Sequence, residues 1–549
     1  MQEAEQLYRQ VLAQQPKHVD AMHNLAVISL QVGRYDLALD LIRRTIALNP
    51  SNPEAHYNLG KALTDMGQLH EGVTSLRQAI RLKPDYAEAH SNLGIALRGL
   101  GQFDQAIAAY REAIRLKPGF AEAHNNLGNV LRDVKQLDGA IAACRQAILL
   151  KPGYAKAHNN LGNALKDNGQ LDEAIAAYRQ AIRLDPGYAE AHVNLEIAYR
   201  DTGQLDKAID SCRQAIAIKP DYAEPHFNLA LSLLTSGDFQ HGWQEYEWRW
   251  KCKDFPSPFA QPQWDGCLLE GRTLLLHTEQ GHGDALQFIR YLPLVAERGG
   301  KIVIECYAEL QRLFQTNTGR CQIVVRGQPL PVFDFHCPLL SLPRVFGTSL
   351  ANIPKDVPYL HADAEDAGRW QQRLADHSPL VKVGLGWAGR PTHTNDRNRS
   401  MKLARLAPLG QAPGARFFSL QKGAAAAEAQ TPPPGMELVD WTEELKDFAD
   451  TAALISNLDL VIAVDTAVVH LAGAMGKPVW TLLPFNSDWR WLLERQDSPW
   501  YPTMRCWLLE RQDSPWYPTM RLFRQPRIGD WDTVITRVVE ALSLWIHVR

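Results

Sequence analysis

The sequence predicts an α-helical solenoid followed by two α/β lobes, each built on a parallel sheet with helices on both faces. Three observations lead to this prediction. A strict period runs through the first part of the chain, short apolar runs alternate with helical stretches in the second part, and a proline-rich stretch at residues 256–266 separates the two patterns. The chain has 549 residues, which is too long for one ordinary hydrophobic core.

The period is seen most clearly in the prolines. They recur every 34 residues, at Pro16, Pro50, Pro84, Pro118, Pro152, Pro186 and Pro220. A 34-residue period, with small residues where two helices cross and a proline that closes the second helix, is the tetratricopeptide pattern. We therefore expect a repeat superhelix over residues 1–252. Because the chain starts with a lone second helix, we also expect a first helix to be missing upstream.

An asparagine recurs with the same period. The residues are Asn58, Asn92, Asn126, Asn160, Asn194 and Asn228, with Asn24 in phase. Asparagine is a mediocre helix former and adds little to a packing face, so we expect a ladder of these side chains along the inside of the superhelix. Carboxamides there can bond an extended polypeptide backbone, which predicts a polypeptide acceptor or partner protein along the repeat groove. The alternative is that each asparagine bonds locally at its helix start and recurs only through duplication.

Histidines form a second ladder. They are His56, His90, His124, His158, His192 and His226. These positions usually carry a bulky packing residue in such repeats, so we expect the histidines to serve packing.

Composition and charge narrow the class of protein. The formal net charge of −3 and pI near 6.7 leave no basic excess, so a nucleic-acid partner is not expected. The N-terminus lacks a signal-peptide pattern, and no stretch approaches the roughly 20 apolar residues needed to span a bilayer. Eight cysteines are scattered without a CxxC pair, which favours reduced thiols. We expect a cytoplasmic protein with no membrane span.

The second part of the chain alternates strands and helices. Strands are predicted at residues 273–277, 301–305, 322–326, 381–387, 416–423, 458–465 and 478–484. This alternation indicates parallel sheets covered on both faces. We place a linker at 253–266, an acceptor-side lobe at 267–378 and a nucleotide-side lobe at 379–549, with a cleft between them. In such sheets, ligands bind at the carboxyl ends of the strands.

One strand end predicts an anion site. The apolar run LDLVIAV ends at Asp465, and a helix of small residues starts near Thr466. Its unpaired backbone N–H groups and its dipole favour an anion. Thr466 adds a hydroxyl donor, Ala467 permits close approach, and His470 lies one turn into the helix. The alternative is that Asp465 only caps this helix.

Other strand ends carry polar groups as well. Gly283 and Asp284 follow the first strand, Trp387 and Arg399 lie in and after GWAGRPTHTNDRNRS, and Gln421 and Lys422 end another strand. Each has a simpler explanation: Asp284 as a helix cap, Arg399 as a solvated charge, and Lys422 as a surface residue. Their common position at predicted carboxyl ends favours a shared site.

Three segments carry a family resemblance. In this order, GHGDALQFIRYLP, FFSLQKG and VDTAVVHLAGAMGKPVW resemble the heptosyltransferase-type glycosyltransferases of the two-lobed GT-B fold, over about 270 residues. The repeats separately resemble those of O-linked N-acetylglucosamine transferases, and the whole architecture is similar to that of repeat-containing bacterial flagellin glycosyltransferases. Two positions depart from the lipopolysaccharide enzymes, because Ala467 and Val468 follow the Asp-Thr pair.

The resemblance implies sugar transfer from a nucleotide-diphosphate donor held chiefly by the C-terminal lobe. Asp284 matches the aspartate that acts as general base. The helix end at Thr466, with Lys422 and Arg399, would stabilise the departing diphosphate. No metal or other cofactor is expected beyond the nucleotide-sugar co-substrate. The exact DxD at residues 530–532 is interpreted as a helix cap.

A 15-residue stretch occurs twice, as WLLERQDSPWYPTMR at residues 491–505 and 507–521. We expect one copy to occupy the family position and the other to bulge near the donor site, which could weaken activity.

These observations predict a protein glycosyltransferase whose repeats deliver Ser or Thr side chains to the cleft. One alternative is a non-catalytic repeat scaffold with a degenerate lobe pair. A second alternative is a glycolipid glycosyltransferase whose repeats recruit partner proteins. The sugar and the nucleotide are set by pocket shape, which single residues do not determine.

Overall fold

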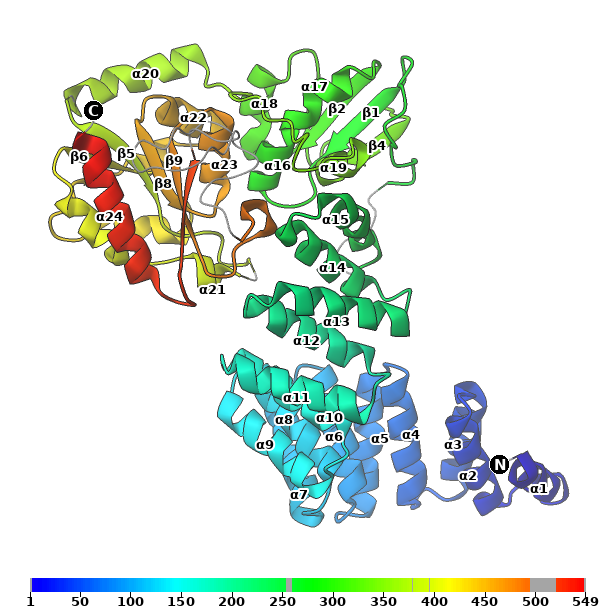
Figure 1. Cartoon of the computed structure of the whole chain (residues 1–549). Coiled ribbons are helices and arrows are strands. Elements are labelled where there is room, and N and C mark those ends of the chain that lie inside the picture. Colours follow the sequence, from blue (N-terminus) through cyan, green and yellow to red (C-terminus); the bar gives the residue numbers. More distant parts are fainter. Residues whose placement is uncertain (1, 253–258, 378, 394, 494–519, 548–549) are drawn as a thin grey trace. The chain divides into compact units, whose positions relative to one another are not determined.

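The computed structural model describes residues 2–252, 259–377, 379–393, 395–493 and 520–547. Two compact units are present, Met1–Pro220 and Asp221–Arg549. Figure 1 shows the helical unit in blue to green and the α/β unit in green to red. Among the described residues, no helix is both long and apolar enough to cross a membrane.

The first unit consists of successive helices. They are α1 (Gln2–Gln14), α2 (Val19–Gln31), α3 (Tyr35–Leu48), α4 (Pro53–Asp65), α5 (Leu69–Leu82), α6 (Ala87–Gly99), α7 (Phe103–Leu116), α8 (Ala121–Asp133), α9 (Leu137–Leu150), α10 (Ala155–Asp167), α11 (Leu171–Leu184), α12 (Ala189–Asp201) and α13 (Leu205–Ile218). From α2 on they pair into helical hairpins, and the predicted solenoid is confirmed.

Small residues set the distance between the two helices of a hairpin. A Cβ added at Gly94 would lie 2.7 Å from the Tyr110 ring, and one at Gly162 would lie 2.5 Å from the Tyr178 ring. The equivalent position 34 residues after Gly162 is Glu196. Its side chain is buried, and its Oε1 lies 3.2 Å from Arg200 Nη1. The 34-residue period is thus a packing period, with one charged exception near the end of the unit.

The histidine ladder packs as predicted at His226, which is buried and stacks on Trp248 with ring centroids 3.7 Å apart, but four earlier histidines make a polar contact instead. In four successive repeats, the histidine Nε2 lies 3.0–3.2 Å from the carbonyl oxygen of the proline six residues earlier: His56 and Pro50, His90 and Pro84, His124 and Pro118, His158 and Pro152. These rings are only half-buried. Each histidine therefore ties its helix to the preceding turn.

The second unit starts with helices α14 (Ala223–Ser236) and α15 (Phe239–Tyr246), followed by the 3₁₀ turn η1 (Glu247–Lys251). Its strands are β1 (Thr273–His277), β2 (Lys301–Cys306), β3 (Gln322–Val325), β4 (Phe335–Pro338), β5 (Val381–Gly386), β6 (Ala415–Ser419), β7 (Leu438–Val439), β8 (Leu460–Val464), β9 (Val479–Leu483) and β10 (Met520–Arg524). Its remaining α-helices are α16 (His282–Phe288), α17 (Leu292–Ala296), α18 (Gln311–Asn317), α19 (Leu342–Val345), α20 (Ala364–Leu374), α21 (Asp396–Arg399), α22 (Phe448–Ser456), α23 (Ala467–Ala474) and α24 (Trp531–His547).

The described strands form two sheets, and neighbouring strands within each sheet run parallel. The first sheet has the order β3-β2-β1-β4, and the second has the order β10-β9-β8-β5-β6-β7. All seven predicted strands are present. The sequence prediction missed β4, which ends in a proline, β7, which has two residues, and β10, which starts inside the duplicated stretch.

Both faces of each sheet are buried. In β1, Leu274 and Leu276 join one hydrophobic cluster while Leu275 joins another. In β8, Val461 and Ile462 likewise point into different clusters. Side chains alternate across a strand, so burial on both faces requires helices on both faces. The doubly wound architecture is confirmed.

Helices α14 and α15 share the hydrophobic core of the α/β unit. Trp243 of α15 meets Phe288 of α16 and Trp489 edge-on, with ring centroids 6.2 and 5.1 Å apart. Arg249 is fully buried and binds the Glu279 carboxylate through two hydrogen bonds of 3.0 Å. The repeat pattern thus extends past Pro220, while the compact α/β unit already begins at Asp221.

Candidate active site

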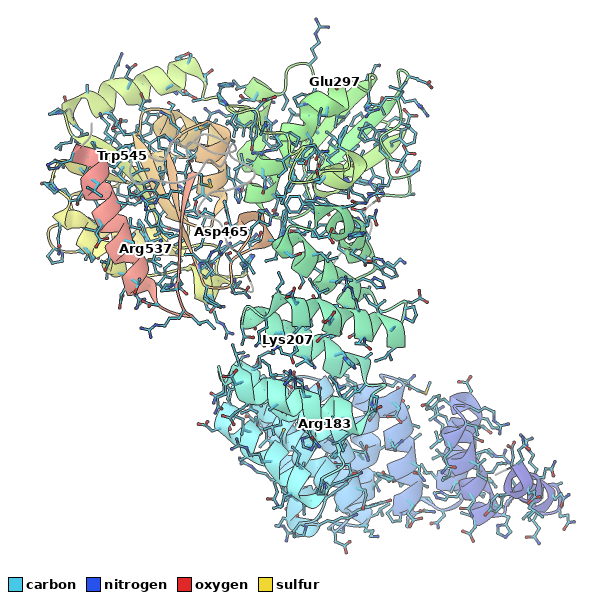
Figure 2. The ribbon with its side chains drawn as sticks, viewed as in Figure 1. Arg183, Lys207, Glu297, Asp465, Arg537 and Trp545 are labelled. Carbon is cyan, nitrogen blue, oxygen red and sulfur yellow. The ribbon has the colours of Figure 1, made fainter. Side chains whose placement is uncertain are left out.

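The junction between β8 and α23 has the form that the sequence predicted. All of β8 is buried, and Asp465, labelled in Figure 2, directly follows it. The N-cap residue of α23 is Thr466, with extended backbone (φ −144°, ψ 172°) and no side-chain capping bond. The alternative that Asp465 caps this helix is therefore wrong.

Asp465 lies in surroundings that disfavour its charge. Its side chain is 14 % exposed, and burial together with the nearby Asp488 raises its pKa to about 6. Arg399 Nη1 donates a hydrogen bond of 3.0 Å to the Asp465 backbone carbonyl. His470 Nε2 lies 3.9 Å from Asp465 Oδ1. Burial lowers the pKa of His470 well below its usual value, so the imidazole is neutral at neutral pH.

Asp284 stands at the start of α16. Its Oδ2 accepts a 2.8 Å hydrogen bond from the Gly281 N–H, so it does cap its helix, as the simpler explanation held. Its Oδ1 accepts a hydrogen bond from Arg490 Nη2, across the junction between the two lobes. Burial raises the pKa of Asp284, while the positive charge of Arg490 opposes that shift. The Asp284 carboxylate thus caps its own helix with one oxygen and contacts the other lobe with the second oxygen.

Two helices from different lobes meet at Gly283. A Cβ added there would lie 2.8 Å from His470 Cδ2 and 3.6 Å from Ala467 Cα. Glycine is needed because α16 packs directly against the start of α23. The structure therefore brings together Gly283, Asp284, Ala467 and His470, which are far apart in the sequence.

The loops after β5 and β6 are tied to each other. Gln421 Oε1 accepts hydrogen bonds from the N–H groups of Trp387 and Ala388, at 2.9 and 2.8 Å. The Trp387 ring is fully buried. Lys422 Nζ donates to the carbonyl oxygens of Thr442 and Leu445, at 2.6 and 2.9 Å. These side chains shape the loops of the C-terminal lobe, and their contact with a donor stays a prediction.

The sequence prediction missed Arg490. It lies in the 3₁₀ turn η9 (Trp489–Trp491), which follows β9, and its side chain is only 8 % exposed. It bonds to Asp284, to Asp488 Oδ1 at 2.7 Å and to Gln287 Oε1 at 2.7 Å. The rule that polar groups gather after parallel strands could have found it, because Asp488 and Arg490 follow PVWTLLP.

A pocket of about 750 Å³ lies elsewhere in the N-terminal lobe. Its lining includes Thr273, Lys301 and Gln322, the first residues of β1, β2 and β3. It therefore opens at the amino ends of these strands. The polar cluster around Asp284 lies at the opposite, carboxyl edge of the same sheet.

The asparagine ladder bonds mainly within the superhelix. Asn58 Nδ2 lies 3.4 Å from His23 Nε2, and three others donate to a side chain 35 residues earlier: Asn92 to Tyr57, Asn160 to Asn125 and Asn194 to Asn159, at 2.8–3.0 Å. Asn160 and Asn228 are buried. Asn126 accepts only a long 3.4 Å bond from its neighbour Asn125. The ladder thus links successive repeats, which neither sequence interpretation included.

Two further sequence observations can be located. Asp530 Oδ1 accepts a 3.2 Å hydrogen bond from the Thr533 N–H at the start of α24, as expected for a helix cap. Residues 491–493 of the first duplicated copy and 520–521 of the second copy belong to the described fold. The rest of both copies, and with it the predicted bulge, lies outside the described residues.

The comparisons with known proteins agree with this division. Residues 1–60, 57–119, 91–155, 155–188 and 198–237 match tetratricopeptide-repeat families. Residues 423–516 match glycosyltransferase family 9 (heptosyltransferase). Protein FlbA of Caulobacter vibrioides is 29 % identical over 336 residues, which cover 56 % of this chain and 53 % of FlbA. The chain thus spans about half the length of this curated relative.

Solved structures resemble parts of the chain. The Cut9–Hcn1 hetero-tetramer of APC/C is 19 % identical with a TM-score of 0.39, covering 42 % of this chain and 46 % of that chain. TTC0263, a tetratricopeptide-repeat protein of Thermus thermophilus, is 27 % identical with a TM-score of 0.30, covering 33 % of this chain and 98 % of that chain. The N-terminal region of this chain is thus similar to tetratricopeptide-repeat proteins, and a segment of its C-terminal lobe is similar to glycosyltransferase family 9 (heptosyltransferase).

Proposed function

We propose that the protein is a glycosyltransferase that moves a sugar from a nucleotide-diphosphate donor to a Ser or Thr hydroxyl of a polypeptide held by the repeats. The observation that carries this proposal is the meeting of α16 and α23. It puts a carboxylate of one lobe beside the N-terminal end of a helix in the other lobe, at the carboxyl ends of two parallel sheets. The family 9 match supports the same activity.

The proposed chemistry is a direct displacement at the anomeric carbon. The acceptor oxygen forms a bond to this carbon as the bond to the diphosphate breaks, and Asp284 takes the hydroxyl proton. The N-terminal end of α23 and the Arg399 guanidinium stabilise the charge that develops on the leaving diphosphate, with Lys422 as a further cation. These groups could perform the function of a metal ion, so we expect no metal requirement.

The first experiment measures donor binding and turnover together. Calorimetric titration with UDP-, GDP-, ADP- and CMP-linked sugars, followed by donor hydrolysis, is carried out on the natural chain and on Asp284→Asn. An asparagine oxygen can still accept the Gly281 N–H, so this variant keeps the helix start. Binding by both forms is expected, with turnover in the natural chain and only a small residual rate in Asp284→Asn. If no donor binds, a non-catalytic repeat scaffold becomes the better hypothesis.

A second experiment tests the polypeptide acceptor. Asn126→Ala removes a carboxamide with only one weak neighbouring bond, whereas Asn160→Ala also breaks the 2.8 Å link to Asn125. If the ladder binds polypeptide, Asn126→Ala lowers the rate of acceptor modification without changing donor hydrolysis or the thermal unfolding midpoint. Asn160→Ala shows how much loss comes from weakened repeat packing. Undiminished modification by the triple variant Asn126, Asn160 and Asn194 to Ala would exclude the ladder and favour a non-peptide acceptor.

A further inference from the structure

Among the described residues, Arg490 is the guanidinium that joins both lobes at the candidate base. Its Nη2 donates to Asp284 Oδ1, and its Nε donates to Gln287 Oε1 one turn further along the same helix. Its Nη1 donates to Asp488 Oδ1, two residues earlier in its own segment. Each of its three nitrogens thus has a separate acceptor. The side chain is 8 % exposed, so these bonds are shielded from water.

We propose that Arg490 is a positioning residue that holds the Asp284 carboxylate in the orientation needed to accept the proton of the acceptor hydroxyl. This inference rests on the proposed function, because it assigns a role to Arg490 only if Asp284 is the base.

The geometry limits how Asp284 can move. One carboxylate oxygen is held by the Gly281 N–H and the other by Arg490, so rotation about the side chain breaks at least one bond. Arg490 is itself fixed by the Trp489 and Phe288 rings, whose centroids lie 4.2 and 5.8 Å from its central carbon. A charge-assisted hydrogen bond from a fixed donor is the usual way to orient a catalytic side chain.

The charges around Asp284 show why this arginine matters. The titratable groups that face it are Arg490 and Asp488 after β9, His393 after β5, Glu279 after β1, Tyr307 after β2 and Tyr246 on α15. Burial lowers the pKa of His393. It lowers the pKa of His470, which packs against Gly283, well below its usual value, so both histidines favour the neutral imidazole. Asp488 and Glu279 oppose ionisation of Asp284. Among these groups, Arg490 is therefore the permanent cation that favours the ionised form of Asp284, against the burial that raises its pKa.

The test compares two substitutions at Arg490. Arg490→Gln removes the charge but keeps a hydrogen-bond donor, and Arg490→Lys keeps the charge but loses the three-way fork. We expect Arg490→Gln to lower kcat about 10- to 100-fold, with little change in KM for the donor. The acidic limb of the pH–rate profile should move to higher pH, because Asp284 loses the charge that favours its ionised form. Arg490→Lys should restore the position of the limb while recovering only part of kcat.

Arg312→Gln is the matched control. Arg312 also links the lobes, through Asp447 and Asp450, but it does not contact Asp284. The Arg312→Gln variant should have lower thermal stability, but the acidic limb of its pH–rate profile should not move. If Arg490→Gln fails to fold, the test is made with Arg490→Lys, both alone and combined with Asp284→Asn.

The double variant distinguishes a failure of the positioning role of Arg490 from a failure of the proposed function. If Arg490 acts through Asp284, adding Arg490→Gln to Asp284→Asn lowers kcat no further. An unshifted acidic limb, or fully additive losses, would overturn the positioning role while leaving the enzyme assignment intact. Absence of transfer by the natural chain with every donor would instead reject the proposed function on which this inference rests.

Discussion

At the scale of single residues, Asp465 shows a conflict between stability and charge. It follows a fully buried strand and makes no helix cap, and burial raises its pKa to about 6 from the usual 3.8. Between these two pH values the folded chain binds more protons than the unfolded chain. The free energy of unfolding therefore falls as pH rises through this window. A residue kept at such a cost is expected at a functional site rather than in a structural cap.

Asp465→Asn should stabilise the protein at neutral pH. The amide keeps the shape of the carboxyl group but has no charge to bury. The gain at pH 7.5 is expected to reach at most about 3 kcal/mol, from a pKa shift of roughly two units at 1.36 kcal/mol each. The gain should shrink steadily toward pH 4, where the folded aspartate is protonated and the unfolded one, with its usual pKa of 3.8, is about half protonated. Chemical denaturation of both forms at pH 4, 6 and 7.5 measures this, and a destabilised variant at pH 7.5 would contradict it.

Single residues also show which parts of the site the sequence could predict. Asp284, Asp465 and His470 each follow a strand that is visible as an apolar run, so the carboxyl-end rule located them. The same rule also applies to Arg490, which follows the strand PVWTLLP, but its pairing with Asp284, 206 positions earlier, leaves no local spacing in the sequence. The asparagines were predicted as a ladder, but their bonds 35 residues back depend on how one repeat stacks on the next. Such contacts are tertiary and leave no periodic signal beyond the repeat itself.

At the scale of elements, long periodic segments were predictable and short ones were not. The helical hairpins repeat one pattern, and strands such as TLLLH and VIAV are predominantly apolar because both faces are buried. Strand β4 reads Phe-His-Cys-Pro and β7 has only two residues, so neither carries a clear strand signal. They pair because their neighbours present open edges, which sequence patterns do not reveal.

The element formed by α15 and η1 depends on a buried charge. Arg249 donates to Glu279, to Glu247 Oε1 at 2.9 Å and to Ser341 Oγ at 2.8 Å, without solvent exposure. Arg249→Met should lower the free energy of unfolding of the α/β unit by about 3–5 kcal/mol, because two carboxylates lose their buried partner.

The loss from Arg249→Met should shrink toward pH 5. Burial already raises the pKa of Glu279, and removal of the arginine raises it further, so the carboxyl becomes neutral more easily. The double variant Arg249→Met with Glu279→Gln serves as the control and should recover part of the loss. Denaturant unfolding at pH 5 and 7.5 measures both effects. Unfolding of Arg249→Met at the same denaturant concentration as the natural chain would show that α15 and η1 are not anchored by this charge.

At the scale of the whole molecule, the duplicated stretch tests how much of the chain the α/β unit needs. The fold uses the beginning of the first copy, in η9, and the end of the second copy, in β10. Because the copies are identical, deleting residues 506–521 leaves the same amino acids at both places. The chain between Leu493 and the methionine that starts β10 shortens from 26 residues to 10.

Excision of residues 506–521 should therefore preserve the fold. Loop-closure entropy alone favours a 10-residue connection over a 26-residue one by about 0.8 kcal/mol. The thermal unfolding midpoint is expected to stay equal or rise slightly, and donor binding measured by calorimetry is expected to be equal or tighter. A lower midpoint together with lost donor binding would show that the folded unit needs more of the two copies than the residues in η9 and β10. Tighter binding with faster transfer would instead show that the duplication impairs an otherwise competent site, since Trp491, which stacks on His470 at 5.5 Å, stands where the first copy begins.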